Sequence, residues 1–166
     1  MKVIKVVTFL RRIILLFVVF FEAIVLSGCN GQNNLVSMKN YEVLEYELNN
    51  YSDASMEIVD ESVSSKGLSL EFHYCGEEEG LTGTWYTLFL YNGNEWNELP
   101  YIIEGNIGWN LIAYVVEKNR ASEMSIDWEW LFGELPAGRY LIVKEFTNHR
   151  GPGDNDQYYL ACEFTI

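Results

Sequence analysis

Residues 127–146, which read DWEWLFGELPAGRYLIVKEF, constrain the fold more than any other part of the sequence. A strand signal ends at two tryptophans, and a second, strongly apolar strand signal begins at Tyr140. Between them, Gly133, Pro136 and Gly138 interrupt the strand pattern and predict a sharp corner. The remaining strands of the folded part must pack around this corner.

Residues 55–166 carry apolar side chains at alternate positions, and turn residues interrupt the pattern about every 8 to 12 positions. Asn92-Gly93 predicts a hairpin turn, because both residues accept a positive φ. Polar loops are predicted at 76–83 and 147–156. Strands are predicted at 56–63, 68–75, 85–91, around Trp96, and at 111–116, 124–128, 140–146 and 158–166. Seven to eight strands of this length predict an all-β fold, an immunoglobulin-like (Ig-like) antiparallel β-sandwich.

Residues 1–28 have the pattern of an export signal. Four basic residues come first, and an apolar run of 14 residues, 13–26, follows them and contains Glu22. A membrane-spanning helix needs about 20 apolar residues, so this run predicts a cleaved signal peptide. The next residues, Leu26-Ser27-Gly28-Cys29, resemble the lipobox of bacterial lipoproteins. That resemblance implies lipidation of Cys29 and a membrane anchor; the alternative is an ordinary signal peptide followed by an incidental cysteine.

Residues 29–54 are predicted to be a tether that carries the folded domain, 55–166, away from the membrane. The start, NGQNNLVS, is polar and has no strand or helix pattern. Residues 38–51 fit either an edge strand or a short helix. These assignments predict a protein that is lipid-anchored to the cell membrane and faces the extracellular side.

The charge of the chain argues against binding to nucleic acids. The whole sequence has 11 basic and 24 acidic residues. Removal of the four basic and one acidic residues before Cys29 leaves seven basic and 23 acidic residues, a net charge of −16. Such a chain repels phosphate backbones.

Two sequence patterns resemble the bacterial Ig-like domain found in secreted and lipoprotein chains of Gram-positive bacteria. The first, WxWLxGxLPxGxYxIVKxF, begins at Trp128, and the second, RGPGDxDxYYLxxEF, begins at Arg150. The resemblance covers most of residues 55–166 and implies an Ig-like sandwich without known catalytic residues or a defined ligand. Tyr140 also resembles the tyrosine corner of Ig-like sandwiches. A weaker likeness, the G-x-Y strand after a Pro/Gly corner, links the chain to bacterial Ig-like proteinase inhibitors.

Chemical groups that would support catalysis or metal binding are few. Cys75 and Cys162 are expected to be structural thiols rather than a disulfide, because no pattern brings them together. His73 is expected on a solvent-exposed strand face and His149 in a loop, so a hydrolytic triad is not supported. Asp127 and Glu129 would share one face of a strand, but a small sandwich offers no cleft for a glycosidase pair. No enzyme activity, metal or cofactor is predicted.

The strongest binding candidates are aromatic side chains and one polar loop. If the strand alternation holds, four aromatic residues cannot all be buried: Trp109, Trp130, Tyr158 and Tyr159. Trp128 and Tyr140 are expected in the core, while Trp109 and Tyr159 are left open. In the loop, Arg150 is expected to pair with Asp154 or Asp156, in preference to a calcium ion held by those carboxylates. The sequence therefore predicts a non-catalytic surface lipoprotein that binds a protein or glycan. The alternative is an inhibitor of an extracellular protease or other enzyme.

Overall fold

The computed structural model describes residues 47–105 and 107–166. These residues belong to the second of two compact units, Leu35–Ile166. The predicted signal peptide, Cys29 and residues 29–46 of the predicted tether lie outside the described residues.

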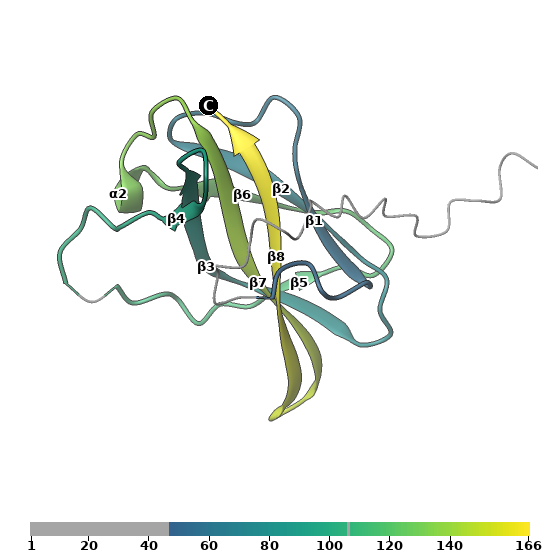
Figure 1. Ribbon diagram of the computed structural model, residues 1–166. Coiled ribbons are helices and arrows are strands. Elements are labelled where there is room, and N and C mark those ends of the chain that lie inside the picture. Colours follow the sequence, from purple (N-terminus) through teal and green to yellow (C-terminus); the bar gives the residue numbers. More distant parts are fainter. Residues whose placement is uncertain (1–46, 106) are drawn as a thin grey trace, which may run out of the picture. The chain divides into compact units, whose positions relative to one another are not determined.

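The described residues form eight strands and one short helix, and every pair of named strands is antiparallel (Figure 1). The predicted all-β Ig-like sandwich is thereby confirmed. The elements are, in chain order, β1 (Ala54–Ile58), β2 (Gly67–Tyr74), β3 (Glu79–Tyr91), β4 (Trp96–Glu98), β5 (Tyr114–Val116), β6 (Ser122–Asp127), α2 (Glu129–Phe132), β7 (Arg139–Gly151) and β8 (Asp154–Thr165).

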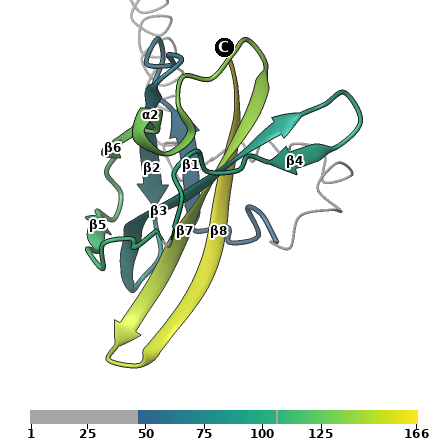
Figure 2. The same cartoon turned by 90° about the vertical axis from the view of Figure 1, so that its left-hand side faces the viewer.

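The strands make two sheets. The smaller sheet has the order β1-β2-β6, and the larger has the order β4-β3-β7-β8 with β5 also paired to β3. β5 pairs with the start of β3, at Gly80 to Thr82, while β4 pairs with its end, at Phe89 to Tyr91. As a result, β5 and β6 lie on one side of the domain and β4 lies on the other (Figure 2).

Alternating side chains from both sheets fill the core, as the period-2 pattern predicted. In β2, Leu68, Leu70, Phe72 and Tyr74 are buried, and the residues between them are partly exposed. In β8, the five residues predicted to share one face all belong to the main apolar cluster: Tyr158, Leu160, Cys162, Phe164 and Ile166. This burial of apolar area is the main driving force for folding.

The corner predicted around Tyr140 is present and is a tyrosine corner. Its hydroxyl donates to the Pro136 carbonyl over 2.8 Å, four residues upstream. Gly138 and Ile166 exchange two backbone hydrogen bonds of 3.1 Å. Trp128 and Tyr140 each stack on Phe164 at 5.3 Å, and both are fully buried, which confirms their predicted core positions.

The chain between β6 and the corner differs from the prediction, because α2 begins at Glu129. Asp127 and Glu129 therefore do not share one face of a strand. The Asp127 carboxylate instead accepts the Glu129 backbone N–H, two residues ahead, over 2.9 Å, which forms an Asx turn where α2 begins. Gly133 ends the helix with a φ of 74°, a conformation that favours glycine.

The loops predicted at 76–83 and 147–156 are largely strand. β3 begins at Glu79, and β7 and β8 continue pairing to Gly151 and Asp154, so only Pro152 and Gly153 form the turn. The polar residues of this hairpin were misread because a two-stranded arm can expose both faces. Conversely, the strands predicted at 56–63 and 111–116 are shorter, as β1 ends at Ile58 and β5 begins at Tyr114.

A β-bulge in β3 is held open by a buried lysine. The pairing of β3 with β7 shifts between Thr82 and Tyr86, so that three residues of β3 face one of β7. Lys144 lies opposite Tyr86 and is 0% exposed. Its ammonium group donates to the Gly83 and Trp85 carbonyls over 2.6 and 3.0 Å. Burial lowers the pKa of Lys144 to about 8.

Leu48 and Asn49, which the sequence analysis assigns to the tether, contact the larger sheet. Leu48 is 4% exposed and forms a parallel bridge with Tyr159 of β8. The Asn49 side-chain amide binds the backbone of Ala161 twice, at 3.0 and 2.9 Å. This pairing covers part of the outer edge of β8, which resembles the edge strand predicted for this region.

We predict that Lys144→Met abolishes a rise in stability between pH 7 and 9.5. In this range the unfolded lysine still holds its proton while the folded one loses it, so the free energy of unfolding of the wild type increases with pH. A folded pKa of about 8 against 10.5 unfolded gives an increase of about 2 kcal/mol. Denaturant titrations of both proteins at several pH values measure it. An equal rise in the variant would contradict the assignment.

Candidate binding groove

The two sheets separate along the side bounded by β5 and β6. The chain leaves the larger sheet at the end of β5 and enters the smaller sheet at β6. The turn between them is fixed to β2 by the Asn119 N–H, which donates to the Tyr74 carbonyl over 2.7 Å. The Ser122 hydroxyl accepts the Glu117 N–H over 2.9 Å. Because β5 pairs with β3 and β6 pairs with β2, the two strands diverge and leave a groove between the sheets.

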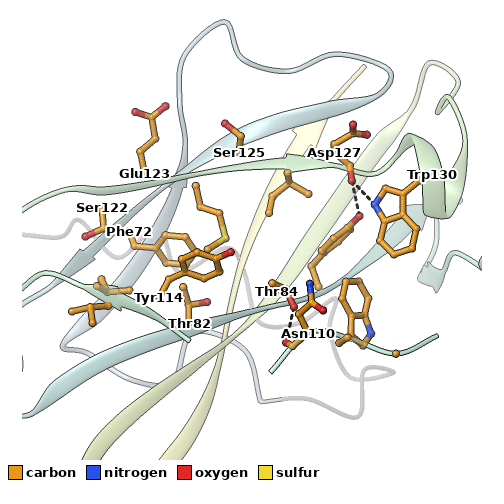
Figure 3. A pocket seen from close by; sticks show the side chains of 17 residues that line it. Phe72, Thr82, Thr84, Asn110, Tyr114, Ser122, Glu123, Ser125, Asp127 and Trp130 are labelled. Carbon is orange, nitrogen blue, oxygen red and sulfur yellow. Dashed lines mark hydrogen bonds between the residues drawn. The ribbon is translucent and has the colours of Figure 1, made fainter. Parts of the chain in front are cut away.

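The groove has a volume of about 630 Å³ and reaches the core (Figure 3). This volume lies within the range of small-ligand and peptide sites. Buried apolar side chains from both sheets contribute to its walls: Phe72, Tyr86, Val116 and Ile126. Its rim is polar along β6, where Glu123, Ser125 and Asp127 line it. The groove therefore offers an apolar interior beside an acidic edge.

Three aromatic side chains form one end of the groove. Trp109 packs edge-on against Tyr86 at 5.3 Å and against Trp130 at 6.1 Å. The Asp127 carbonyl accepts hydrogen bonds from the Tyr86 hydroxyl and the Trp130 indole N–H, at 3.1 and 3.0 Å (Figure 3). The pKa of Tyr86 is raised, mainly by burial, so this phenol remains a neutral hydrogen-bond donor. These contacts hold Trp130 in place although it is 50% exposed.

The described residues expose eight large apolar side chains, of which Tyr114, Val115 and Trp130 line the groove. Apart from Trp130, all come from the segment between residues 101 and 115: Tyr101, Ile102, Ile103, Leu111, Ile112, Tyr114 and Val115. Leu111 is fully exposed, at 104%. Scattered apolar residues are normal on a surface, whereas a concentration in one segment marks a contact site.

The β3 bulge positions part of this exposed segment. Thr84, inside the bulge, donates from its hydroxyl to the Asn110 carbonyl over 3.0 Å. Gly83 lies close enough to the segment that an added Cβ would be 3.8 Å from the Ile112 carbonyl oxygen. The lysine that holds the bulge thus also fixes the backbone that presents Leu111.

The residues that the sequence analysis proposed for binding lie in three separate places. Trp109 and Trp130 come together at the groove. Tyr159 lies on the outer face of the larger sheet, where it contacts Trp85 edge-on at 6.0 Å within a second apolar cluster. Arg150, Asp154 and Asp156 lie at the tip of the β7–β8 hairpin.

At the hairpin tip, Arg150 braces the turn as expected. Its guanidinium contacts Asp154 at 2.7 Å and Asp156 at 2.6 Å. The hydrogen bond from Arg150 lowers the pKa of Asp156. Among the described residues, no group of three or more His, Cys, Asp or Glu side chains is arranged to hold a metal ion.

The histidines and cysteines are not assembled into a reactive site in the described part of the chain. His73 contacts Glu71 at 2.9 Å on β2, while His149 lies in β7 opposite Asn155, and not in a loop. Cys75 and Cys162 are both thiols rather than halves of a disulfide. Burial raises the pKa of the Cys162 thiol, which makes it a poor nucleophile.

The aromatic pair stands out in the sequence, whereas the exposed aliphatic residues and the β6 edge do not. Residues 111–116 are predicted as a strand, and their apolar run gives no sign of which side faces water. One signal was available, because Gly105 and Gly108 precede the apolar run and favour a loop there. Glu123 carried no distinguishing signal.

The fold and the groove define an Ig-like sandwich domain with one open side. A model of the bacterial Ig-like domain matches residues 50–165, so the chain belongs to that family. No curated protein and no solved structure shows significant similarity to the chain. Over the residues that the structure describes, no helix has the length and hydropathy needed to cross a membrane.

Proposed function

We propose that this chain is a cell-surface lipoprotein whose single Ig-like domain binds a protein partner through the groove between β5 and β6. Family membership suggests a surface or extracellular domain, and the family is generally non-catalytic. The observation that supports binding is the concentration of exposed apolar side chains between residues 101 and 115. Tyr101 and Ile102 of this segment contact α2, which carries Trp130.

A protein partner fits this surface better than a glycan. Sugars stack on aromatic faces and need hydrogen-bonding side chains around them. Here aliphatic residues such as Ile102, Leu111 and Ile112 make up much of the exposed surface. Aromatic anchors surrounded by aliphatic contacts are typical of the centre of a protein interface.

We expect the purified wild-type chain to capture a specific protein from cell-envelope extract, and Leu111→Ser with Trp130→Ala to reduce capture about tenfold or more. Both side chains are exposed, so the domain should remain folded, which thermal unfolding checks. Arg150→Ala, at the hairpin tip, is the matched control and should retain capture. Loss of capture in the control alone would move the binding site to the hairpin.

The anchor is proposed from Cys29. Lipid at this position would tether the chain to the outer side of the membrane. We expect metabolic incorporation of a palmitate analogue into the wild type, and no incorporation into Cys29→Ser. A variant labelled as strongly as the wild type would contradict lipidation at Cys29.

A second candidate function is inhibition of an extracellular protease by the β7–β8 hairpin, which projects from the rest of the described domain (Figure 1). Its turn is braced by Arg150, and a rigid turn loses little entropy on binding. A panel of serine, cysteine and metalloproteases separates the two candidates. We expect no inhibition; inhibition that disappears on replacement of Pro152 and Gly153 would support the inhibitor instead.

A further inference from the structure

The outer edge of β6 has unpaired backbone groups beside the groove. β6 ends the smaller sheet and pairs only with β2. The Trp128 N–H donates to the Lys66 carbonyl over 2.9 Å, and this fixes which residues bond toward β2. Since backbone groups alternate between the two edges of an antiparallel strand, Met124 and Ile126 bond to β2. The N–H and C=O groups of Glu123 and Ser125 therefore point to the open edge.

The position beside β6 is one that constant-type Ig sandwiches fill with a strand of their own. The sheet of those domains that corresponds to β1-β2-β6 has four strands, whereas this one has three. The chain between β4 and β5 would have to supply the fourth, but its described residues form no strand. The groove lies beside β6, at the position that this fourth strand would fill.

Acidic side chains on the outer face of the smaller sheet favour a basic residue on any strand that pairs with the open edge of β6. Glu57, Glu71 and Glu123 are direct cross-strand neighbours and form one row across β1, β2 and β6. Like charges directly opposite each other destabilise a sheet. His73 contacts Glu71, but the described residues place no cation beside Glu57 or Glu123 in an ion pair. A fourth strand with a lysine or arginine opposite Glu123 would relieve the row at its open end.

We propose that the groove receives an extended, basic segment of a partner protein, which pairs with β6 as a fourth strand. The inference rests on the proposed binding function and specifies its chemistry. The segment alternates apolar and basic residues, because one face of the added strand enters the groove and the other continues the acidic row. A second copy of this chain is disfavoured as the occupant, because its own β6 presents Glu123 and Asp127.

A peptide test addresses the strand directly. The probes are a nine-residue peptide that alternates valine and lysine and a matched peptide that alternates valine and glutamate. With the full chain, the lysine peptide should bind and slow hydrogen exchange at the amides of Glu123 and Ser125. The glutamate peptide should do neither.

Two charge reversals separate the β6 edge from general electrostatics. Glu123→Lys should weaken binding of the lysine peptide about fivefold or more and increase binding of the glutamate peptide. Glu57→Lys makes the same change in the same acidic row, but on β1 and outside the groove, and should alter both affinities little. Equal effects of the two reversals would overturn the proposal, because binding would then follow net charge alone.

A proline variant and the captured partner distinguish failure of this inference from failure of the proposed function. Ser125→Pro removes an N–H that faces the open edge and leaves the bonds to β2 in place, so it should abolish peptide protection. If the captured partner is lost with Leu111→Ser and Trp130→Ala but retained by Glu123→Lys and Ser125→Pro, the groove binds without strand addition. That result would overturn the inference and retain the function.

Discussion

The contact between the Lys144 ammonium and the two carbonyls of the β3 bulge is the interaction on which the open side of this domain depends. The bulge divides the outer edge of β3 into two lengths, one paired with β5 and the other with β4. Without the bulge, β3 would present one continuous edge, which a single long strand could pair with in place of the separate β4 and β5. The bulge also fixes Thr84 against Asn110, and so places the exposed segment beside the groove. A buried charge costs stability unless it is hydrogen-bonded. The Lys144 ammonium meets this condition because it bonds the Gly83 and Trp85 carbonyls, which the bulge leaves in need of a donor.

The sequence predicted the fold well where the local signal and the tertiary role agree. Alternation in β2 and β8 marks the core face, and the Gly/Pro corner with Tyr140 is defined by backbone geometry that few other residues satisfy. α2 was missed because four residues, Glu129–Phe132, give no helical periodicity. The length of the β7–β8 hairpin was missed because no residue from His149 to Gln157 is buried, and only the cross-strand pairing defines this end as strand.

The groove could be predicted only in part. Trp109 and Trp130 stand out by residue type, and their contact depends on α2, which turns Trp130 back toward the β6 end. The exposure of Leu111 depends on where the bulge directs the chain, a tertiary property that an apolar run does not encode. The acidic row likewise requires the register of three strands, since Glu57, Glu71 and Glu123 are far apart in sequence.

Open strand edges expose proteins to uncontrolled pairing, and the two open regions of this domain are treated differently. Part of the β8 edge is covered by Asn49, which bonds to the backbone of Ala161. The β6 edge is left uncovered but carries Glu123 and Asp127, and charged side chains at an edge discourage pairing with further copies of the same chain. The acidic row weakens the sheet that contains it, so stability alone does not account for it. An edge that repels its own kind and adjoins an apolar groove is instead suited to accept a strand of opposite charge.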